Sequence, residues 1–189
     1  MDTFTKYMQP ILAKKEGGEY TNNPADKGGA TRWGVTEHVA RACGYLGDMR
    51  DLTIDTALVI DRKMFWTQPR LDLIDPIMPG LAAYMLDLGV NMGPRWPAYF
   101  VQRALNVLNR QGQDYPDVEI DGVFGVLSRA ALSAFLVKRG WEGGGVLMSM
   151  VRAQASVRYI EIAEHNPTQE TFEYGWQHWR AYAPPAAEA

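Results

Sequence analysis

The sequence has few of the residues that would indicate a disulfide-stabilised or metal-dependent protein. It contains a single cysteine, Cys43, so no intrachain disulfide can form and the fold has to be stable without one. Its three histidines, His38, His165 and His178, are scattered. The chain also lacks a His-Glu-x-x-His pattern and paired cysteines, which excludes the usual ligand patterns of zinc peptidases and amidases. We therefore expect no metal and no cofactor.

Long apolar runs and a strong net charge are also missing. No stretch approaches the length of a membrane span, and the first residues lack the basic segment and apolar region of a secretory signal peptide. The formal net charge of -3 at pH 7 leaves no electrostatic footprint for nucleic acid or an anionic membrane surface. We expect cytoplasmic synthesis, no nucleic-acid partner, no membrane insertion and a monomer.

The residues that are present suit a globular protein rich in helices. The chain has 189 residues, of which 47% are hydrophobic and 22% are charged, enough for one or two small domains with a real core. Apolar spacing and cap residues predict helices at 4–15, 37–43, 54–66, 79–91, 98–109, 126–139, 145–165 and 172–182. Strand signals are confined to 32–36 and, more weakly, 119–120. The predicted fold is mainly α, with a small hairpin.

Helix breakers suggest how the chain is divided. They cluster in Gly93-Pro94-Arg95-Trp96-Pro97, which predicts a first lobe of residues 1–95 and a helical second lobe of residues 96–189. Within the second lobe, Gly143-Gly144-Gly145 lacks the lysine of a phosphate-binding loop and predicts a flexible joint. Three aromatic residues near the end recur at spacings of three and are predicted to pack: Trp176, Trp179 and Tyr182.

The segment from Glu16 to Thr36 is the most informative part of the chain. It gathers carboxylates, hydroxyls, amides, aromatics and glycines before the next apolar run. A predicted amphipathic helix ends at Glu16, because Gly17-Gly18 is a strong stop signal. The partial negative charge of a helix C-terminus disfavours a second anion, so a carboxyl group there tends to keep its proton. A general acid for glycosidic cleavage needs such a group.

A second carboxylate and a hydroxyl follow in the same segment. Asp26 lies in a polar, glycine-rich stretch where a carboxylate can stay ionised, and the hydroxyl of Thr31 can help to hold a water molecule. Taken singly, each of these residues is better explained as a solvated helix end, a turn or a cap. Only the combination indicates a catalytic site.

The pattern from Glu16 to Thr36 resembles the N-terminal signature of glycoside hydrolase family 108, whose members are lysozyme-like N-acetylmuramidases common among phage endolysins. Asp87-Leu88-Gly89-Val90-Asn91-Met92-Gly93 is similar to the family's second segment. The stretch 105–132, with Asp121-Gly122-Val123-Phe124-Gly125, resembles its peptidoglycan-binding-like C-terminal part. The resemblance implies a lysozyme-like helical lobe with a hairpin near the active site, bacterial peptidoglycan as substrate and partner, and release to the cell wall through a holin.

The same resemblance implies a reaction and three catalytic residues. The reaction is hydrolysis of the β-1,4 bond between N-acetylmuramic acid and N-acetylglucosamine. Glu16 would protonate the leaving oxygen, Asp26 would act from the opposite side of the sugar, and Thr31 would position water. Two other functions stay open at this point: a lytic transglycosylase, which can work with a single acid/base, and a non-catalytic peptidoglycan-binding or virion structural module.

One residue departs from the family's pattern. The family usually reads Glu-Gly-Gly-Tyr, whereas this chain has an additional residue, Glu19, before Tyr20. We prefer Glu16 as the acid because it ends a helix, and a rigid element holds a site residue more accurately than a loop does. Glu19 is the alternative.

Several other residues of these segments are predicted to contact substrate. Asp87 and Asn91 are four residues apart and therefore project from one face of a helix. The alternative for Asp87 is a hydrogen bond that satisfies a neighbouring backbone group. Tyr20 and Trp33 can either line a cleft or close the core. The full predicted binding set is Tyr20, Asn22, Gly28, Gly29, Trp33, Asp87 and Asn91.

Overall fold

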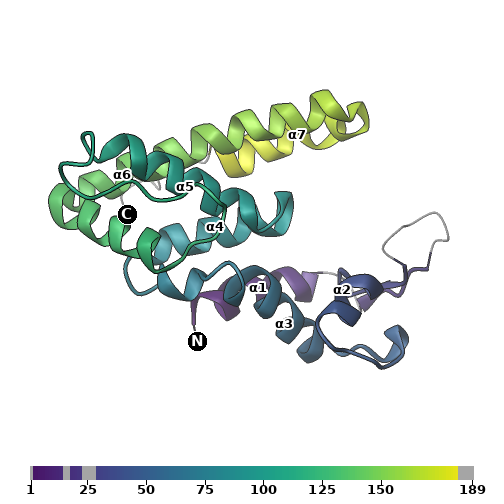
Figure 1. Ribbon diagram of the computed structural model, residues 1–189. Helices are drawn as coiled ribbons and strands as arrows, with labels where there is room; N and C mark the ends of the chain where they lie inside the picture. The colour runs from purple at the N-terminus through teal and green to yellow at the C-terminus, as the bar shows by residue number, and fades with distance from the viewer. Residues whose placement is uncertain (1, 15–17, 23–28, 183–189) are drawn as a thin grey trace, which may run out of the picture.

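The computed structural model describes residues 2–14, 18–22 and 29–182, and it is mainly helical (Figure 1). The α-helices are α1 (Thr3–Lys14), α2 (Glu37–Ala42), α3 (Ile54–Arg62), α4 (Pro79–Met92), α5 (Arg95–Leu108), α6 (Val126–His165) and α7 (Glu170–Trp176). Strands β1 (Thr31–Arg32) and β2 (Val35–Thr36) form an antiparallel hairpin. Short 3-10 turns are η2 (Met49–Asp51), η4 (Leu71–Leu73) and η5 (Pro167–Gln169), and π-helical turns are η3 (Lys63–Thr67) and η6 (Gln177–Ala181). The predicted fold class, mainly α with a small hairpin, is confirmed.

Local signals explain where several helices begin and end. The Thr36 hydroxyl accepts from the backbone of Val39 and starts α2, and Thr53 caps α3 in the same way. Pro79 occupies the first turn of α4, where its missing N–H costs nothing. Gly93, with φ of 99°, ends that helix in a conformation that favours glycine.

The helices form layers, and the hairpin lies at one end of them. In Figure 1, α6 and α7 run along one side, α4 and α5 lie in the middle, and α1 and α3 lie on the other side. The hairpin and α2 project beside α1 and α3, away from α7. The hairpin, which is the described C-terminal part of the predicted catalytic segment, therefore lies at the α1–α3 end of the molecule.

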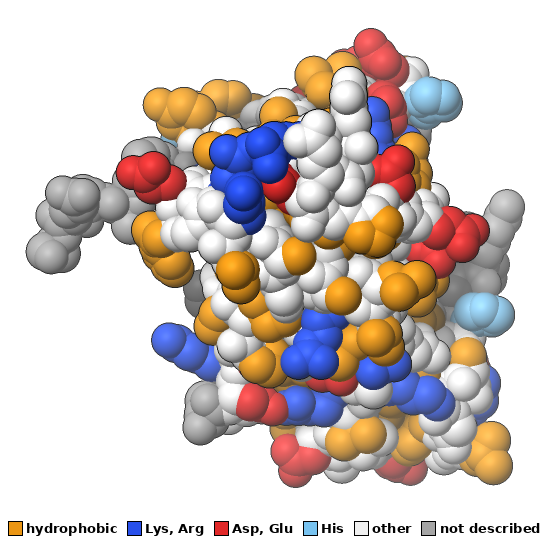
Figure 2. Space-filling model, turned by 60° about the vertical axis from the view of Figure 1, so that its left-hand side comes forward, with side chains coloured by type: hydrophobic (Ala, Val, Ile, Leu, Met, Phe, Trp, Pro, Cys, Tyr) orange, Lys and Arg blue, Asp and Glu red, His pale blue; other side chains and the backbone are white. Residues whose placement is uncertain are grey.

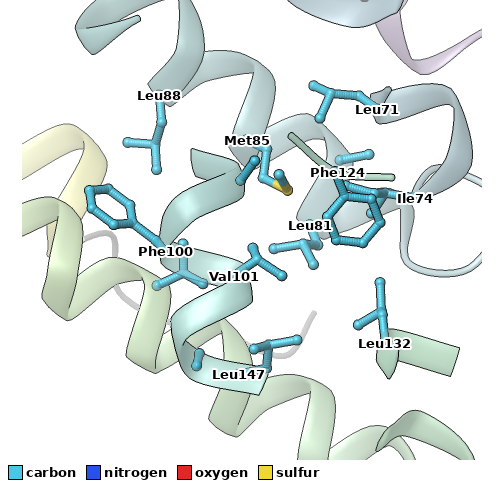
Figure 3. Close-up of a cluster of buried hydrophobic side chains, with 14 of the residues drawn as sticks. Leu71, Ile74, Leu81, Met85, Leu88, Phe100, Val101, Phe124, Leu132 and Leu147 are labelled. Atoms are coloured by element: carbon cyan, nitrogen blue, oxygen red, sulfur yellow. The ribbon is translucent and has the colours of Figure 1, made fainter. Parts of the chain in front are cut away.

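The larger hydrophobic core joins residues from both halves of the chain. Figure 3 shows side chains of α4, α5 and α6 pointing toward one another, together with Phe124 from the preceding loop. The cluster extends from Phe4 in α1 to Tyr159 in α6. A second cluster lies under the hairpin and consists of Ala30, Val35, Ala40, Met49, Leu52, Ala57 and Ile60. The predicted division of the chain at residue 95 stays a prediction.

An ion pair fixes the start of α1 against α3. Arg62 donates to both carboxylate oxygens of Asp2, at 2.6 and 3.1 Å, and to the hydroxyl of Thr5 at 2.8 Å. These hydrogen bonds hold the pKa of Asp2 well below its ordinary value. The helix that leads to the predicted acid is thus tied to its neighbour at its first turn.

The long helix α6 bends at a different glycine from the one predicted. Gly140 has φ of 63° and ψ of -158°, which breaks the helix there. The expectation of a flexible joint at Gly143-Gly144-Gly145 is wrong, because Gly143 and Gly144 are helical and buried. A Cβ on Gly143 would lie 2.2 Å from the side chain of Arg139. That glycine is needed for close packing after the bend, not for flexibility.

Two further expectations differ from the structure. Residues 119–120 form irregular backbone instead of a strand. Trp176 packs as predicted, stacking on Tyr159 with ring centroids 5.1 Å apart, but Trp179 and Tyr182 are 74% and 72% exposed. The wider π-helical turn after Trp176 changes the residue spacing, so aromatics three residues apart no longer share one face.

The Asp121–Gly125 loop is fastened to α5 by one buried side chain. Gln102 is 1% exposed, and its Nε2 donates to the Asp121 carboxylate, the Val123 carbonyl and the Ser128 hydroxyl. Its Oε1 accepts from the backbone N–H of Gly122 at 2.9 Å. With Val123 N–H as a further donor, these bonds lower the pKa of Asp121. The motif is therefore a structural connection between α5 and α6.

Replacing Gln102 by alanine is expected to destabilise the fold by about 2–4 kcal/mol, because it leaves buried polar groups unpaired and opens a cavity. Urea unfolding followed by circular dichroism measures the loss. Gln113→Ala is the matched control, since this glutamine is exposed and should change stability by less than about 0.5 kcal/mol. Equal stability of the two variants would contradict the anchoring role of Gln102.

Candidate functional site

The hairpin and the chain before it form a small three-segment sheet. Thr31 pairs with Thr36 across the hairpin, and on its other side it bridges to Thr21. The two bridge hydrogen bonds join Thr21 and Thr31 in both directions, at 2.9 and 2.8 Å. Thr31 therefore lies in the middle of this sheet with its backbone held on both sides.

Gly18 is held in place by two side chains of the hairpin, those of Arg32 and Trp33. Its carbonyl accepts from Nε of Arg32 at 3.2 Å, and its φ of 63° is one that favours glycine. The ring of Trp33 covers it so closely that a Cβ on Gly18 would lie 2.3 Å from the indole. Trp33 is fixed in turn because its Nε1 donates to the carbonyl of Leu52 at 2.9 Å. These contacts fix the position of Gly18, which follows Glu16 by two residues in the sequence, against the hairpin.

A polar pocket of about 380 Å³ opens beside the hairpin. Two of the predicted binding residues, Tyr20 and Asn22, line it. The other lining residues are Ala30, Glu37, Arg41, Leu46, Gly47, Asp48, Met49 and Arg50. The guanidinium of Arg50 lies over the Tyr20 ring, 5.5 Å from its centroid. Amide, carboxylate and guanidinium groups in one pocket suit the hydroxyls and acetamido groups of an amino sugar.

Glu37 is one of two carboxylates in this pocket, the other being Asp48, that the sequence reasoning missed. Its Oε1 accepts from Arg41 at 2.7 Å, and its Oε2 faces Gly29, where a Cβ would come within 3.4 Å. Arg41 also donates to the carbonyls of Tyr45 and Gly47, at 2.8 and 2.7 Å, so it holds the pocket wall together. The available signal was a glutamate and an arginine four residues apart directly after the Thr36 cap.

Thr31 lies on a different face of the sheet from this pocket. Side chains alternate along a strand, and Ala30, the neighbour of Thr31, lines the pocket, as do Tyr20 and Asn22 on either side of Thr21. The Thr31 hydroxyl is half-buried, and its one hydrogen bond to a described residue is a long one of 3.5 Å to the Gly29 carbonyl. It keeps its capacity to bind water. The structure therefore brings Tyr20 and Asn22 together, but not Thr31 with them.

Three predicted site residues, Glu16, Asp26 and Gly28, lie outside the described residues. The alternative acid, Glu19, is described and exposed, and it makes no hydrogen bond or ion pair with another residue of the described ranges. Within the described ranges, therefore, no side chain or backbone group orients this carboxylate for directed proton transfer. The preference for Glu16 over Glu19 stays a prediction.

Asp87 belongs to a separate cluster between α1, α4 and the end of the chain. Its Oδ2 lies 3.1 Å from Nε of Arg180, and burial raises its pKa although the arginine acts in the opposite direction. The hydroxyl of Tyr84 donates to the Arg180 carbonyl at 3.0 Å, and Tyr7 of α1 is close enough to feel the Asp87 charge. Asn91, one turn after Asp87, is exposed. Neither Asp87 nor Asn91 lines the polar pocket.

Neither a metal cluster nor a membrane helix is found in the described parts of the chain. Within those ranges, no three His, Cys, Asp or Glu side chains come together in a way that could hold a metal ion. No helix there combines the length and the apolar character needed to cross a membrane. On the face shown in Figure 2, acidic and basic side chains are interspersed with hydrophobic ones.

Gly18→Ala is expected to disrupt the site and to destabilise the fold by roughly 2–4 kcal/mol, because the methyl group would overlap the Trp33 ring and the positive φ would be strained. Urea unfolding and loss of turbidity of permeabilised bacteria measure the two effects. Gly175→Ala is the matched control, since a Cβ there meets nothing within 4 Å and alanine favours a helix. An active, stable Gly18→Ala protein would show that the Trp33 contact does not matter.

Comparisons with known proteins agree with this arrangement. Residues 9–93 match the family model "Glycosyl hydrolase 108", and residues 96–181 match the model "Predicted Peptidoglycan domain". The chain is also similar to a solved structure described as "Structure of Brucella abortus SagA", with 25% sequence identity and a TM-score of 0.62. That similarity covers 93% of this chain and 87% of the other. A comparison with curated proteins found no match.

The helical fold, the hairpin and the polar pocket, together with these matches, define a lysozyme-like peptidoglycan hydrolase. Residues 9–93 resemble the glycosyl hydrolase 108 family, and residues 96–181 resemble a predicted peptidoglycan domain. The chain is accordingly a glycoside hydrolase that acts on peptidoglycan.

Proposed function

We propose that this protein is an N-acetylmuramidase that hydrolyses the β-1,4 bond between N-acetylmuramic acid and N-acetylglucosamine. The observation that carries the proposal is the packing of residues 18–22 against the hairpin of β1 and β2. Gly18 is clamped by Arg32 and Trp33, and the next residues, Tyr20 and Asn22, line a polar pocket of about 380 Å³. A glycan-cutting enzyme needs such a fixed support beside its acid and a polar subsite for the sugar.

The proposed reaction gives each of the two carboxyl groups its own role. Glu16 gives its proton to the glycosidic oxygen while the bond from that oxygen to the anomeric carbon breaks. Asp26 acts on the opposite face of the sugar, either by taking a proton from the attacking water or by forming a glycosyl-enzyme intermediate that water then cleaves. Tyr20, Asn22 and Glu37 would bind the neighbouring sugar through its hydroxyl and acetamido groups.

The bond that is cut can be identified from the ends of the products. Purified peptidoglycan is digested with the protein, and the soluble muropeptides are analysed by mass spectrometry. We expect new reducing ends on N-acetylmuramic acid. Reducing ends on N-acetylglucosamine would indicate a different glycosidase, and 1,6-anhydro ends would indicate a lytic transglycosylase. Absence of cleavage would favour a non-catalytic binding module.

Thr31 is proposed to position the attacking water through its hydroxyl. Thr31→Ser is therefore expected to retain much of the activity, whereas Thr31→Ala loses most of it. The backbone bonds to Thr21 do not depend on the side chain, so both variants should keep the hairpin. Initial rates of peptidoglycan solubilisation test this, with Thr21→Ala as the control for removing a threonine from the same sheet. Full activity of Thr31→Ala would exclude a role for the hydroxyl.

The route to the substrate is also a proposal. Synthesis in the cytoplasm followed by release through a holin, as in phage endolysins, would bring the enzyme to the wall. Co-expression with and without a holin in a bacterial host distinguishes this route from self-release, because lysis should then depend on the holin.

A further inference from the structure

A groove with three arginines runs along α5 and α6, on a part of the molecule that shares no residue with the polar pocket. It consists of three adjoining cavities of about 370, 450 and 310 Å³. Trp96 and Tyr99 line the first two cavities, and Arg103 and Gln154 line the second and third. The shared residues make the cavities one continuous surface feature, which we call the α5–α6 groove.

The aromatic rings of the groove hold arginine side chains in place. The guanidinium of Arg158 lies over the Trp96 ring, 3.9 Å from its centroid, and that of Arg103 lies over the Tyr99 ring at 5.5 Å. Trp96 and Tyr99 brace each other edge to face, with centroids 5.8 Å apart. A guanidinium stacked on a ring loses little further freedom when it binds a ligand. Because each ring already carries an arginine, the groove presents cations instead of bare rings.

The arginines of the groove outnumber its carboxylates: Arg95, Arg103 and Arg158 stand against Asp121 and Glu161. Arg103 is exposed and has no ion-pair partner among the described residues. Arg158 donates to Glu161 through Nη1 at 2.9 Å, but its Nε is buried without a hydrogen-bond partner in the described chain. The other carboxylate of the groove, Asp121, is engaged by Gln102 and by a backbone N–H. With three arginines and two carboxylates, the groove keeps a net positive charge.

We infer that the α5–α6 groove binds carboxylates of the peptidoglycan stem peptides, with Arg103 and Arg158 as the principal contacts. This inference rests on the proposed action on peptidoglycan and adds a second contact with the wall, remote from the bond that is cut. Guanidinium groups bind carboxylates through paired, charge-assisted hydrogen bonds. The groove residues from Trp96 onward lie within the region that matches the predicted peptidoglycan domain. Holding the polymer at a second point raises the effective concentration of glycan at the catalytic end.

The test measures binding without cleavage by using a Glu16→Gln background. Co-sedimentation with purified sacculi is compared for that parent protein and for the same protein carrying Arg103→Gln and Arg158→Gln. Losing two arginine–carboxylate contacts is expected to weaken binding by about tenfold or more. Arg129→Gln is the matched control, since this exposed arginine on α6 loses the same charge and lines none of the three cavities. It should bind as the parent does.

A second arm identifies the chemical group that is bound. An amidase removes the stem peptides from one batch of sacculi. The parent protein should bind these stripped sacculi only weakly, at the level at which the double variant binds intact sacculi. Equal binding of the parent to stripped and intact sacculi would overturn the inference and assign the groove to the glycan. Undiminished binding of the double variant to intact sacculi, or a parent that does not bind them, would overturn it as well.

Two controls keep this result separate from folding and from catalysis. Thermal unfolding followed by circular dichroism shows whether the double variant folds. If it does not, the single variant Arg103→Gln, at an exposed position, is used instead. Weaker binding of that variant is expected, and unchanged binding would contradict the inference. Binding by the Glu16→Gln protein does not require hydrolysis. Failure of the wild-type protein to cleave peptidoglycan would therefore contradict the proposed function while the binding result stands by itself.

Discussion

Glu16→Gln is expected to abolish nearly all lytic activity while leaving the fold unchanged. Glutamine has almost the same shape as glutamate but has no carboxyl proton to give to the leaving oxygen. Loss of general acid catalysis typically costs about 10²–10⁴-fold in rate. Turbidity loss of outer-membrane-permeabilised bacteria measures the rate, and circular dichroism shows whether the helices are intact.

Glu19→Gln is the matched comparison for this experiment, because it removes the neighbouring carboxylate that the inserted residue introduces. Glu19 is exposed and without contacts to other described residues, so its replacement is expected to keep activity near the wild-type level. The opposite pattern, an active Glu16→Gln protein and an inactive Glu19→Gln protein, would show that the additional residue has shifted the register. The acid would then be Glu19.

Asp26→Asn is expected to be about as damaging as loss of the acid, again about 10²–10⁴-fold. An amide can neither accept the proton of the attacking water nor carry the negative charge that stabilises an oxocarbenium-like transition state. The same turbidity assay applies, with Asp55→Asn, an exposed aspartate in the first turn of α3, as the control. An Asp26→Asn protein with full activity would remove the second carboxylate from the mechanism and favour a single-acid transglycosylase.

The pH dependence of the wild-type rate follows from the same two groups. Activity requires Asp26 ionised and Glu16 protonated, so the rate should rise as Asp26 loses its proton and fall as Glu16 loses its own. The two limbs report the pair of carboxyl groups together if they interact strongly. In the Asp26→Asn variant, the residual activity should lack the acidic limb.

Local sequence signals predicted the elements whose causes are local. The start of α4 at Pro79 and its end before Gly93 follow from the conformations that proline and glycine allow. The start of α2 follows from a hydroxyl that reaches a backbone N–H three residues later. The bend in α6 was misplaced, because periodicity does not show which of several nearby glycines will leave the helical region. That choice depends on Arg139 and Phe135 packing over Gly143.

Features that depend on distant parts of the chain could not be predicted in this way. The Glu37–Arg41 pair lies within α2 and has a local signal, but the pocket it shares with Tyr20, Asn22 and Arg50 depends on how separate segments pack together. For Asp87, the sequence left a substrate contact and a structural hydrogen bond open, and it did not indicate the ion pair with Arg180, which lies far along the chain. The α5–α6 groove likewise needs α6 to lie alongside α5. No spacing within a single helix indicates such contacts.

The most direct test of the central claim is digestion of peptidoglycan in water enriched in oxygen-18, followed at once by borohydride reduction and mass spectrometry. A muramidase adds one water molecule across the cleaved bond, so the account predicts one heavy oxygen at the former anomeric carbon of each new N-acetylmuramic acid end. The Glu16→Gln protein should release almost no labelled product. Unlabelled 1,6-anhydro ends from the wild-type protein, or heavy oxygen on N-acetylglucosamine ends, would contradict the account.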